Sequence, residues 1–455
     1  MCFASHYAPT NCRVKEIPGN LKYVRNDISE AGFSRSKSDR HFLRRTGRKR
    51  VSGWSARLGL LAERNFRVFY FGYATSLLGS AMSPIAINFA LLDRGVTPSG
   101  LGLVLAAGVV PQVLFMIGGG VLADRLGRRP VMLATDVGRA AVMATTASLL
   151  FAAWPPVWVF AVLAALRGTG DAFFTPALGG LRAEIAAPGR LPDANALLGV
   201  AQSAAMVIGP ALAGTLIVAI SPAAVVAVDA ATYGVSVVAL VLLQMPPARP
   251  ATGTAWRDLA DGWKQFRAHN WIWLTTVQWS LLNLFTYAPY LLLGPVLARQ
   301  YLGGARVWGI VIGVQAAGAV LMGLLLIGRR ASRPLLVSVL GTVAVPLPCL
   351  MLALHEPAVA VAAAACTAGA GITLSGTFWS TAMQRRVPPG MLSRITSLNM
   401  TGSFALGSFG LALVGPAAEA LGTTPVLAFA AAWGLVSGII VCCLPPIWAV
   451  RWQDG

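Results

Sequence analysis

Long apolar stretches alternate with short polar segments from about residue 67 to about residue 445. A helix needs roughly 20 mostly apolar residues to cross a bilayer. Twelve stretches meet this length: about 67–92, 100–122, 130–152, 156–178, 195–220, 222–244, 271–298, 306–327, 334–353, 357–382, 396–420 and 423–445. Glycine and proline mark most of the gaps between them. The pattern predicts an all-α integral membrane protein with twelve transmembrane helices.

The basic residues between these stretches fall mainly on alternate loops. If the chain enters its first span from the cytoplasm, fifteen lie in inside loops and three, Arg94, Arg299 and Arg306, in outside loops. The inside set is Arg125, Arg128, Arg129, Arg182, Arg190, Arg249, Arg257, Lys264, Arg267, Arg329, Arg330, Arg333, Arg385, Arg386 and Arg394. Because lysine and arginine are retained on the cytoplasmic side, both termini are predicted to be cytoplasmic.

Composition supports lipid as the main solvent. The 455 residues are 56% hydrophobic and 12% charged, with a mean hydropathy of +0.66, whereas soluble domains carry about 25% charged residues. The net charge of +19 follows from the basic loops, so we expect no nucleic-acid partner. The six cysteines have no metal-ligand spacing with histidine, and no Walker sequence or ordered nucleophile motif is present. We therefore expect no metal, no cofactor and no enzymatic activity.

The chain divides into four parts. Residues 1–50 form a basic, disordered tail, residues 51–244 a first six-helix bundle, residues 245–270 a cytoplasmic linker with an amphipathic helix, and residues 271–455 a second bundle. The halves repeat weakly: APGRLPDANAL before the fifth span resembles PPGMLSRITSL before the eleventh. Two pseudo-repeated bundles are typical of alternating-access transporters.

A motif between the second and third spans carries a family resemblance. The stretch GGGVLADRLGRRPVML contains, in order, Gly120, Ala123, Asp124, Arg125, Gly127, Arg128 and Arg129. It resembles the signature loop of the major facilitator superfamily, which in that family clamps the two halves in the outward-facing state. The equivalent segment of the second half, IGRRASRP, lacks the aspartate. The resemblance predicts that this loop is a conformational gate.

Ionisable residues inside the spans are candidates for proton coupling, because a charge in lipid is costly without a partner or a cavity. The fourth span carries Arg167 and, four residues on, Asp171; the Arg followed by glycines resembles a family motif linked to carboxylate protonation. Asp171 is the nearest candidate partner of Arg167. Asp136 and Arg139 lie in the third span and Asp229 in the sixth. Structural ion pairing and hydrogen-bonded packing remain the alternatives for these residues.

The fifth span contains IGPALAG, in which Gly209, Pro210 and Gly214 resemble the Gly-Pro motif of the family's exporters. That motif bends the helix and brings it close to the eighth span. Uncharged polar or aromatic residues within spans are candidates for the substrate cavity: Gln202, Gln278, Asn283, Tyr287, Gln315 and Asn399. Each serves equally well as an interhelical hydrogen bond.

Over residues 60–445 the chain is similar to bacterial exporters of this superfamily, the subfamily of the enterobactin exporter and drug-efflux permeases. The resemblance implies a monomeric, multi-pass inner-membrane protein that exports a small amphiphilic compound (a drug, secondary metabolite or siderophore) in exchange for protons. The alternatives are an uptake carrier of the same fold and a membrane sensor or scaffold that does not transport.

The basic tail generates a first prediction. VSGWSARLGLLAERNFRVFYFG reads like the start of a transporter, so translation beginning near Val51 is a hypothesis alongside a tail held near anionic lipid and a targeting peptide. The intact mass of the native protein tests the start near Val51. A mass lacking residues 1–50 is expected if the start lies near Val51, and a mass including them contradicts it.

Overall fold

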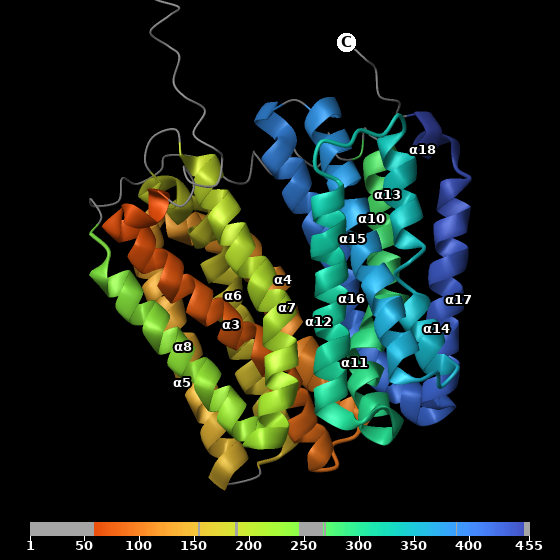
Figure 1. Cartoon of the computed structure of the whole chain (residues 1–455), viewed down its shortest axis with the longest axis horizontal. Helices are drawn as coiled ribbons and strands as arrows, with labels where there is room; N and C mark the ends of the chain where they lie inside the picture. The colour runs from red at the N-terminus through yellow and green to blue at the C-terminus, as the bar shows by residue number, and fades with distance from the viewer. Residues whose placement is uncertain are drawn as a thin grey trace, which may run out of the picture. The chain divides into compact units, whose positions relative to one another are not determined.

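The structure, a computed structural model, describes residues 59–152, 155–186, 190–244, 267, 270–387 and 389–449. Every regular element in these ranges is helical (Figure 1). The tail of residues 1–50, the alternative start near Val51 and the linker segment 245–266 lie outside the described residues. All of the described residues belong to the compact unit of residues 54–455.

The first half contains a short 3₁₀ turn, η1 (Gly59–Ala62), and six long helices. These are α3 (Arg64–Asp93), α4 (Pro98–Leu126), α5 (Arg128–Ala152), α6 (Val157–Ile185), α7 (Leu191–Ala219) and α8 (Pro222–Leu242). The pairs α3 with α8, α4 with α6, and α5 with both α6 and α8 make its main contacts.

The second half has the same number of spanning segments, two of them interrupted. The first is α10 (Asn270–Leu282), the π-helical turn η2 (Asn283–Tyr287), α11 (Ala288–Leu297) and the π-helical turn η3 (Ala298–Leu302). Then follow α12 (Gly304–Leu325), the pair α13 (Pro334–Thr342) and α14 (Leu347–Ala353), α15 (Ala358–Arg386), α16 (Pro389–Leu421), α17 (Thr423–Cys442) and the short α18 (Pro445–Ala449).

Eleven of the described helical segments are long and apolar enough to cross a membrane. The remaining one is α5, whose 25 residues exceed the roughly 20 needed. It contains Asp136 and Arg139 together with Arg128 and Arg129 at its start, and these charges lower its hydropathy. The helices correspond to the twelve expected stretches, but the count of twelve spans stays a prediction.

The two halves repeat the same close helix contacts. In the first, the backbones of α4 and α6 meet at Gly108 and Gly168; in the second, α12 and α15 meet at Gln315 and Gly369. Across the halves, α4 packs on α16 and α7 on α12, as Figure 1 shows for α7 and α12. Small residues at such crossings let helix backbones approach each other in a membrane, so the weak sequence repeat corresponds to a repeat of packing.

Two polar contacts between the halves lie at the end of the bundle opposite the basic loops. The Ser99 amide of α4 donates to Glu419 Oε1 of α16 over 2.9 Å. At the same end, Arg299 Nε of η3 lies 3.3 Å from Asp93 Oδ1 of α3. With the predicted orientation, this is the extracytoplasmic end, and the backbones of α16 and α4 pack closely there at Gly415 and Ser99.

The contact between α4 and α6 generates a second prediction. A methyl group at Gly168 would overlap the backbone carbonyl of Gly108, whereas a methyl group at Gly138 of α5 meets no atom within 4 Å. Gly168→Ala should therefore destabilise the protein by about 1–3 kcal/mol through overpacking. Thermal unfolding of purified protein in detergent measures this, with Gly138→Ala as the control. Equal melting temperatures for the two variants would contradict the contact.

Candidate functional site

A buried cluster of charged side chains lies inside the first half, and Arg139 of α5 is at its centre. Arg139 Nη1 donates to Asp171 Oδ1 of α6 over 2.7 Å, and Nη2 donates to Asp136 Oδ1 one helix turn away on α5. Arg139 is only 6% exposed and Asp136 is fully buried. Both carboxylates of this triad thus share a single guanidinium.

Aromatic rings and a hydroxyl complete the surroundings of Arg139. Its guanidinium carbon lies 4.0 Å from the ring centroid of Phe174 and 4.7 Å from that of Tyr233, within cation–π range. Ser236 of α8 donates to the second oxygen of Asp136 over 2.6 Å. These contacts join α5, α6 and α8 at one point.

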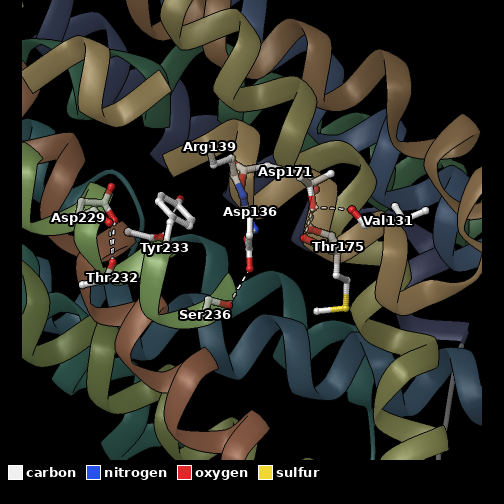
Figure 2. A network of polar contacts seen from close by, with 12 residues as sticks. Val131, Asp136, Arg139, Asp171, Thr175, Asp229, Thr232, Tyr233 and Ser236 are labelled. Atoms are coloured by element: carbon white, nitrogen blue, oxygen red, sulfur yellow. Dashed lines mark hydrogen bonds and ion pairs between the residues drawn. The ribbon is translucent and has the colours of Figure 1, made fainter. Parts of the chain in front are cut away.

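Asp229 of α8 lies on the other side of Tyr233 from Asp136 and Arg139 (Figure 2). Its carboxyl accepts hydrogen bonds from the hydroxyls of Ser83 on α3 and, over 3.4 Å, Thr232. The side chain is fully buried. Among the described residues, no lysine or arginine nitrogen lies within 4 Å of it, so its partners are neutral hydroxyls.

Arg167 of α6 has a different environment from the expected one. Asp171 is paired with Arg139, not with Arg167, which corrects the pairing inferred from the four-residue spacing. Arg167 instead lies among Tyr233, Asp171 and Asp229, which are its electrostatic neighbours. Its Nε has no hydrogen-bond partner in the described part of the chain. All five ionisable candidates, Asp136, Arg139, Arg167, Asp171 and Asp229, therefore belong to one neighbourhood.

A cavity of about 280 Å³ opens beside this cluster, between α3, α4, α5 and α6. Arg167 and Asp171 line it together with three uncharged polar side chains, Asn88, Gln112 and Thr146; the rest of the wall is apolar or glycine. The charged cluster thus borders a space able to hold water or part of a ligand.

A second cavity, of about 360 Å³, lies where the halves meet, between α4, η2, α11 and α16. Two cavity candidates from the sequence, Asn283 and Tyr287, are at the two ends of the π-helical turn and line it. Such turns occur often at functional sites. Gln112 and Val109 of α4 line both cavities, and no charged side chain is among the described lining of the second.

The other cavity candidates lie elsewhere. Gln278 donates to Thr342 over 3.0 Å and Asn399 donates to Thr276 over 2.6 Å, both within the second half. Gln315 accepts from Tyr290 over 3.2 Å. Gln202 has an exposed side chain and lines neither cavity. Asn283 also donates to the Ser403 carbonyl of α16 over 3.2 Å, so four of the six make helix–helix hydrogen bonds, and their part in substrate binding stays a prediction.

The described arginines of the signature loop hold helix ends within the first half. Arg129 donates to the carbonyls of Leu240 and Val241 at the end of α8, each over 2.8 Å. Arg128 donates to Gly180 and, over 2.8 Å, to Glu184 of α6. Gly127 has a φ of 91°, which favours glycine at this turn. Arg125 is exposed, and the side chain of Asp124 and the surroundings of Gly120 lie outside the description.

The Gly-Pro segment of α7 approaches α12 closely. Gly309 of α12 lies against the Pro210 carbonyl, and Gly214 lies against Ala305. Gly209 packs on Ala81 of α3. The segment has the close approach that the resemblance implied, while its relation to the direction of transport is untested.

Two polar residues that border the cavities, Asn88 and Gln112, were not among the sequence candidates. Both are amides inside predicted spans, the same signal that selected Gln202 and Asn399. The sequence alone gives no reason to rank Asn88 and Gln112 above the other amides. A helix that is apolar on all sides has no hydrophobic periodicity, so the sequence does not show which side chains face a cavity.

The comparisons with known proteins agree with this architecture. A model of the Major Facilitator Superfamily matches residues 69–411, so the chain belongs to this family of membrane transporters. It is a multi-pass membrane protein, and the family confirms the expectation of a transporter and not an enzyme.

Similar proteins include macrolide efflux protein A of Streptococcus pyogenes, 25% identical over 58% of this chain and 66% of that protein, slightly under two thirds of its length. The multidrug efflux pump Tap of Mycolicibacterium fortuitum is 23% identical over 82% of this chain and 94% of that pump. Among solved structures, the nucleoside transporter NupG has a TM-score of 0.67 at 11% identity, covering 85% of this chain and 100% of that one. This likeness supports the fold alone.

The charged cluster generates a third prediction. Arg139→Gln leaves Asp136 and Asp171 without their shared cation, which should destabilise the protein by about 3–5 kcal/mol. Adding Asp136→Asn and Asp171→Asn to that variant should recover a large part of the loss, since no unpaired charge then remains. Thermal unfolding in detergent is the measurement.

The matched control is Arg299→Gln, which removes one member of an ion pair whose side chains are 46% and 53% exposed. We expect a change of about 0–1 kcal/mol there. A triple variant no more stable than Arg139→Gln alone would contradict the charge-pairing account.

Proposed function

We propose that the protein is a secondary active exporter of small amphiphilic compounds, driven by exchange of protons through alternating access. The observation that carries the proposal is the buried charged cluster that shares Arg167 and Asp171 with a cavity next to the interface of the halves. Efflux proteins among the relatives support the direction of transport. The proposal includes cytoplasmic termini, which the distribution of basic loops supports, and a monomer as the working unit.

The charge balance of the cluster supports proton binding. Three carboxyl groups face two guanidinium groups, so one carboxyl is in excess when all are ionised. Asp136 and Asp171 are both held by Arg139, whereas Asp229 has only hydroxyl donors within bonding distance. We therefore assign the exchangeable proton to Asp229, with Arg167, Arg139 and Tyr233 as the ionisable groups around it.

The cavity between the halves supports an amphiphilic substrate. Its described lining is mostly aliphatic, with Asn283, Gln112, Tyr287 and Thr401 as polar groups and no charge to match a sugar phosphate or an amino acid. A predominantly apolar site with a few polar groups is typical of small-molecule binding. The contacts between the halves at the extracytoplasmic end support an inward-facing stage of the cycle, in which the cytosolic compound enters.

The fourth prediction tests the carrier of the proton. In cells lacking their major pumps, the protein should lower accumulation of an amphiphilic dye, and a protonophore should abolish this effect. Asp229→Asn keeps an oxygen that can accept from Ser83 but cannot release a proton, so efflux should fall at least about tenfold while substrate binding persists. Dye efflux at equal membrane expression is the measurement.

Glu356→Gln is the control, because Glu356 lies in the connection between α14 and α15 and lines neither cavity, and it should retain most of the efflux. Full protonophore-sensitive efflux by Asp229→Asn would remove Asp229 from the coupling mechanism. If the intact protein leaves the accumulation of every dye in a broad panel unchanged, an uptake carrier or a non-transporting role is favoured.

A further inference from the structure

The cavity inside the first half contains two buried polar atoms that lack partners. Asn88 Oδ1 and Arg167 Nε have no hydrogen bond within the described part of the chain, and both residues line this cavity. Asn88 is only 7% exposed. Buried polar groups in native proteins are nearly always paired, so an orphaned acceptor and an orphaned donor in the same cavity point to an absent partner.

The size of this cavity exceeds what one or two waters fill. Its volume is about 280 Å³, whereas one water takes about 30 Å³ in the liquid. The volume is close to the lower end of the range for small-molecule sites, about 300 Å³. The cavity is thus large enough for a functional group of a ligand.

The polar groups of the cavity define the chemistry of that functional group. The orphaned atoms are one acceptor and one donor, so a partner needs both a donor and an acceptor. The two charged residues of the wall, Arg167 and Asp171, have opposite signs, so the wall has no net charge to attract an ion. A neutral amide, hydroxyl or carbonyl group matches both conditions.

The neighbouring cavity offers the complementary environment. Its wall is mostly aliphatic, and Gln112 borders both spaces. A molecule with a polar end and an apolar body could place its end beside Asn88 and its body between α4, α11 and α16. Gln112 would then lie at the boundary between the two parts of the molecule.

We propose that the cavity in the first half is a polar subsite, which binds the neutral hydrogen-bonding end of a substrate whose apolar body occupies the cavity between the halves. Asn88 accepts from this end and Arg167 donates to it. Because Arg167 also borders Asp229 and Tyr233, the polar end of the substrate contacts the group next to the proposed proton carrier. The inference rests on the proposed function and names the substrate class for it.

The fifth prediction uses two probes that differ in hydrogen bonding. Chloramphenicol is neutral and has amide and hydroxyl groups; tetraphenylphosphonium has apolar rings and no hydrogen-bonding group. Asn88→Leu should raise the Kd for chloramphenicol at least about tenfold, the effect of losing a hydrogen bond in a buried site. The same substitution should change the Kd for tetraphenylphosphonium less than about twofold. Binding of both probes to the full chain in lipid nanodiscs is the measurement.

Two further variants separate the loss of a hydrogen bond at Asn88 from a general loss of binding. Asn88→Ser retains a smaller polar group and should recover part of the chloramphenicol affinity. Thr145→Val changes an exposed residue of α5 that lines neither cavity, and both affinities should stay unchanged. Binding of tetraphenylphosphonium by each variant also shows that it is folded.

Three outcomes would overturn the subsite. Equal weakening of both probes by Asn88→Leu would mean that Asn88 supports the structure only. Unchanged binding of both would mean that the cavity holds water only, and a wild-type protein that does not bind chloramphenicol would exclude the substrate class. Proton-driven dye efflux, measured separately, would stand in all three cases, so failure of the subsite is distinguishable from failure of the proposed function.

Discussion

The pairing of Arg139 with two carboxylates is the contact on which the first half depends. A charged side chain in the membrane interior is costly unless it faces a partner inside the bundle. Arg139 and Asp136 are on α5, so this helix has to turn one face toward Asp171 of α6 and Ser236 of α8. The same charges that make α5 the least apolar long helix therefore fix its position between its neighbours.

The cluster also links packing to the proposed mechanism. Arg167 borders the cavity, Asp229 and Tyr233 at the same time. Under the proposed function, a proton on Asp229 removes one negative charge near Arg167 and changes how strongly its guanidinium is held. The binding of a substrate group to Arg167 then depends on the charge of Asp229, and this coupling is what exchange of substrate and proton requires.

The sequence predicted the helices well, because spans of about 20 apolar residues with basic loops are a strong signal. It also selected the five charged residues of the cluster, since any ion in a span stands out. The predicted pairing of Arg167 with Asp171 was wrong. Helical spacing compares residues on one helix only, so it cannot show that Arg139 of α5 lies closer to Asp171 than Arg167 does. The sequence analysis selected Gln202 and missed Gln112, because an almost entirely apolar stretch gives no signal for which side of the helix faces the cavity.

The two halves share their packing but differ in charge. In the described spans of the second half, the buried polar side chains are neutral, as in the bonds of Gln278 to Thr342 and Asn399 to Thr276. Under the proposed alternating access, the described spans of the second half change their environment without exposing a buried ion to lipid. The first half has the buried charges, and its α5, α6 and α8 are joined by them. Under the proposed function, proton binding lies in the charged first half, whereas the substrate contacts both halves, with its polar end beside Asn88 and its apolar body between α4, α11 and α16.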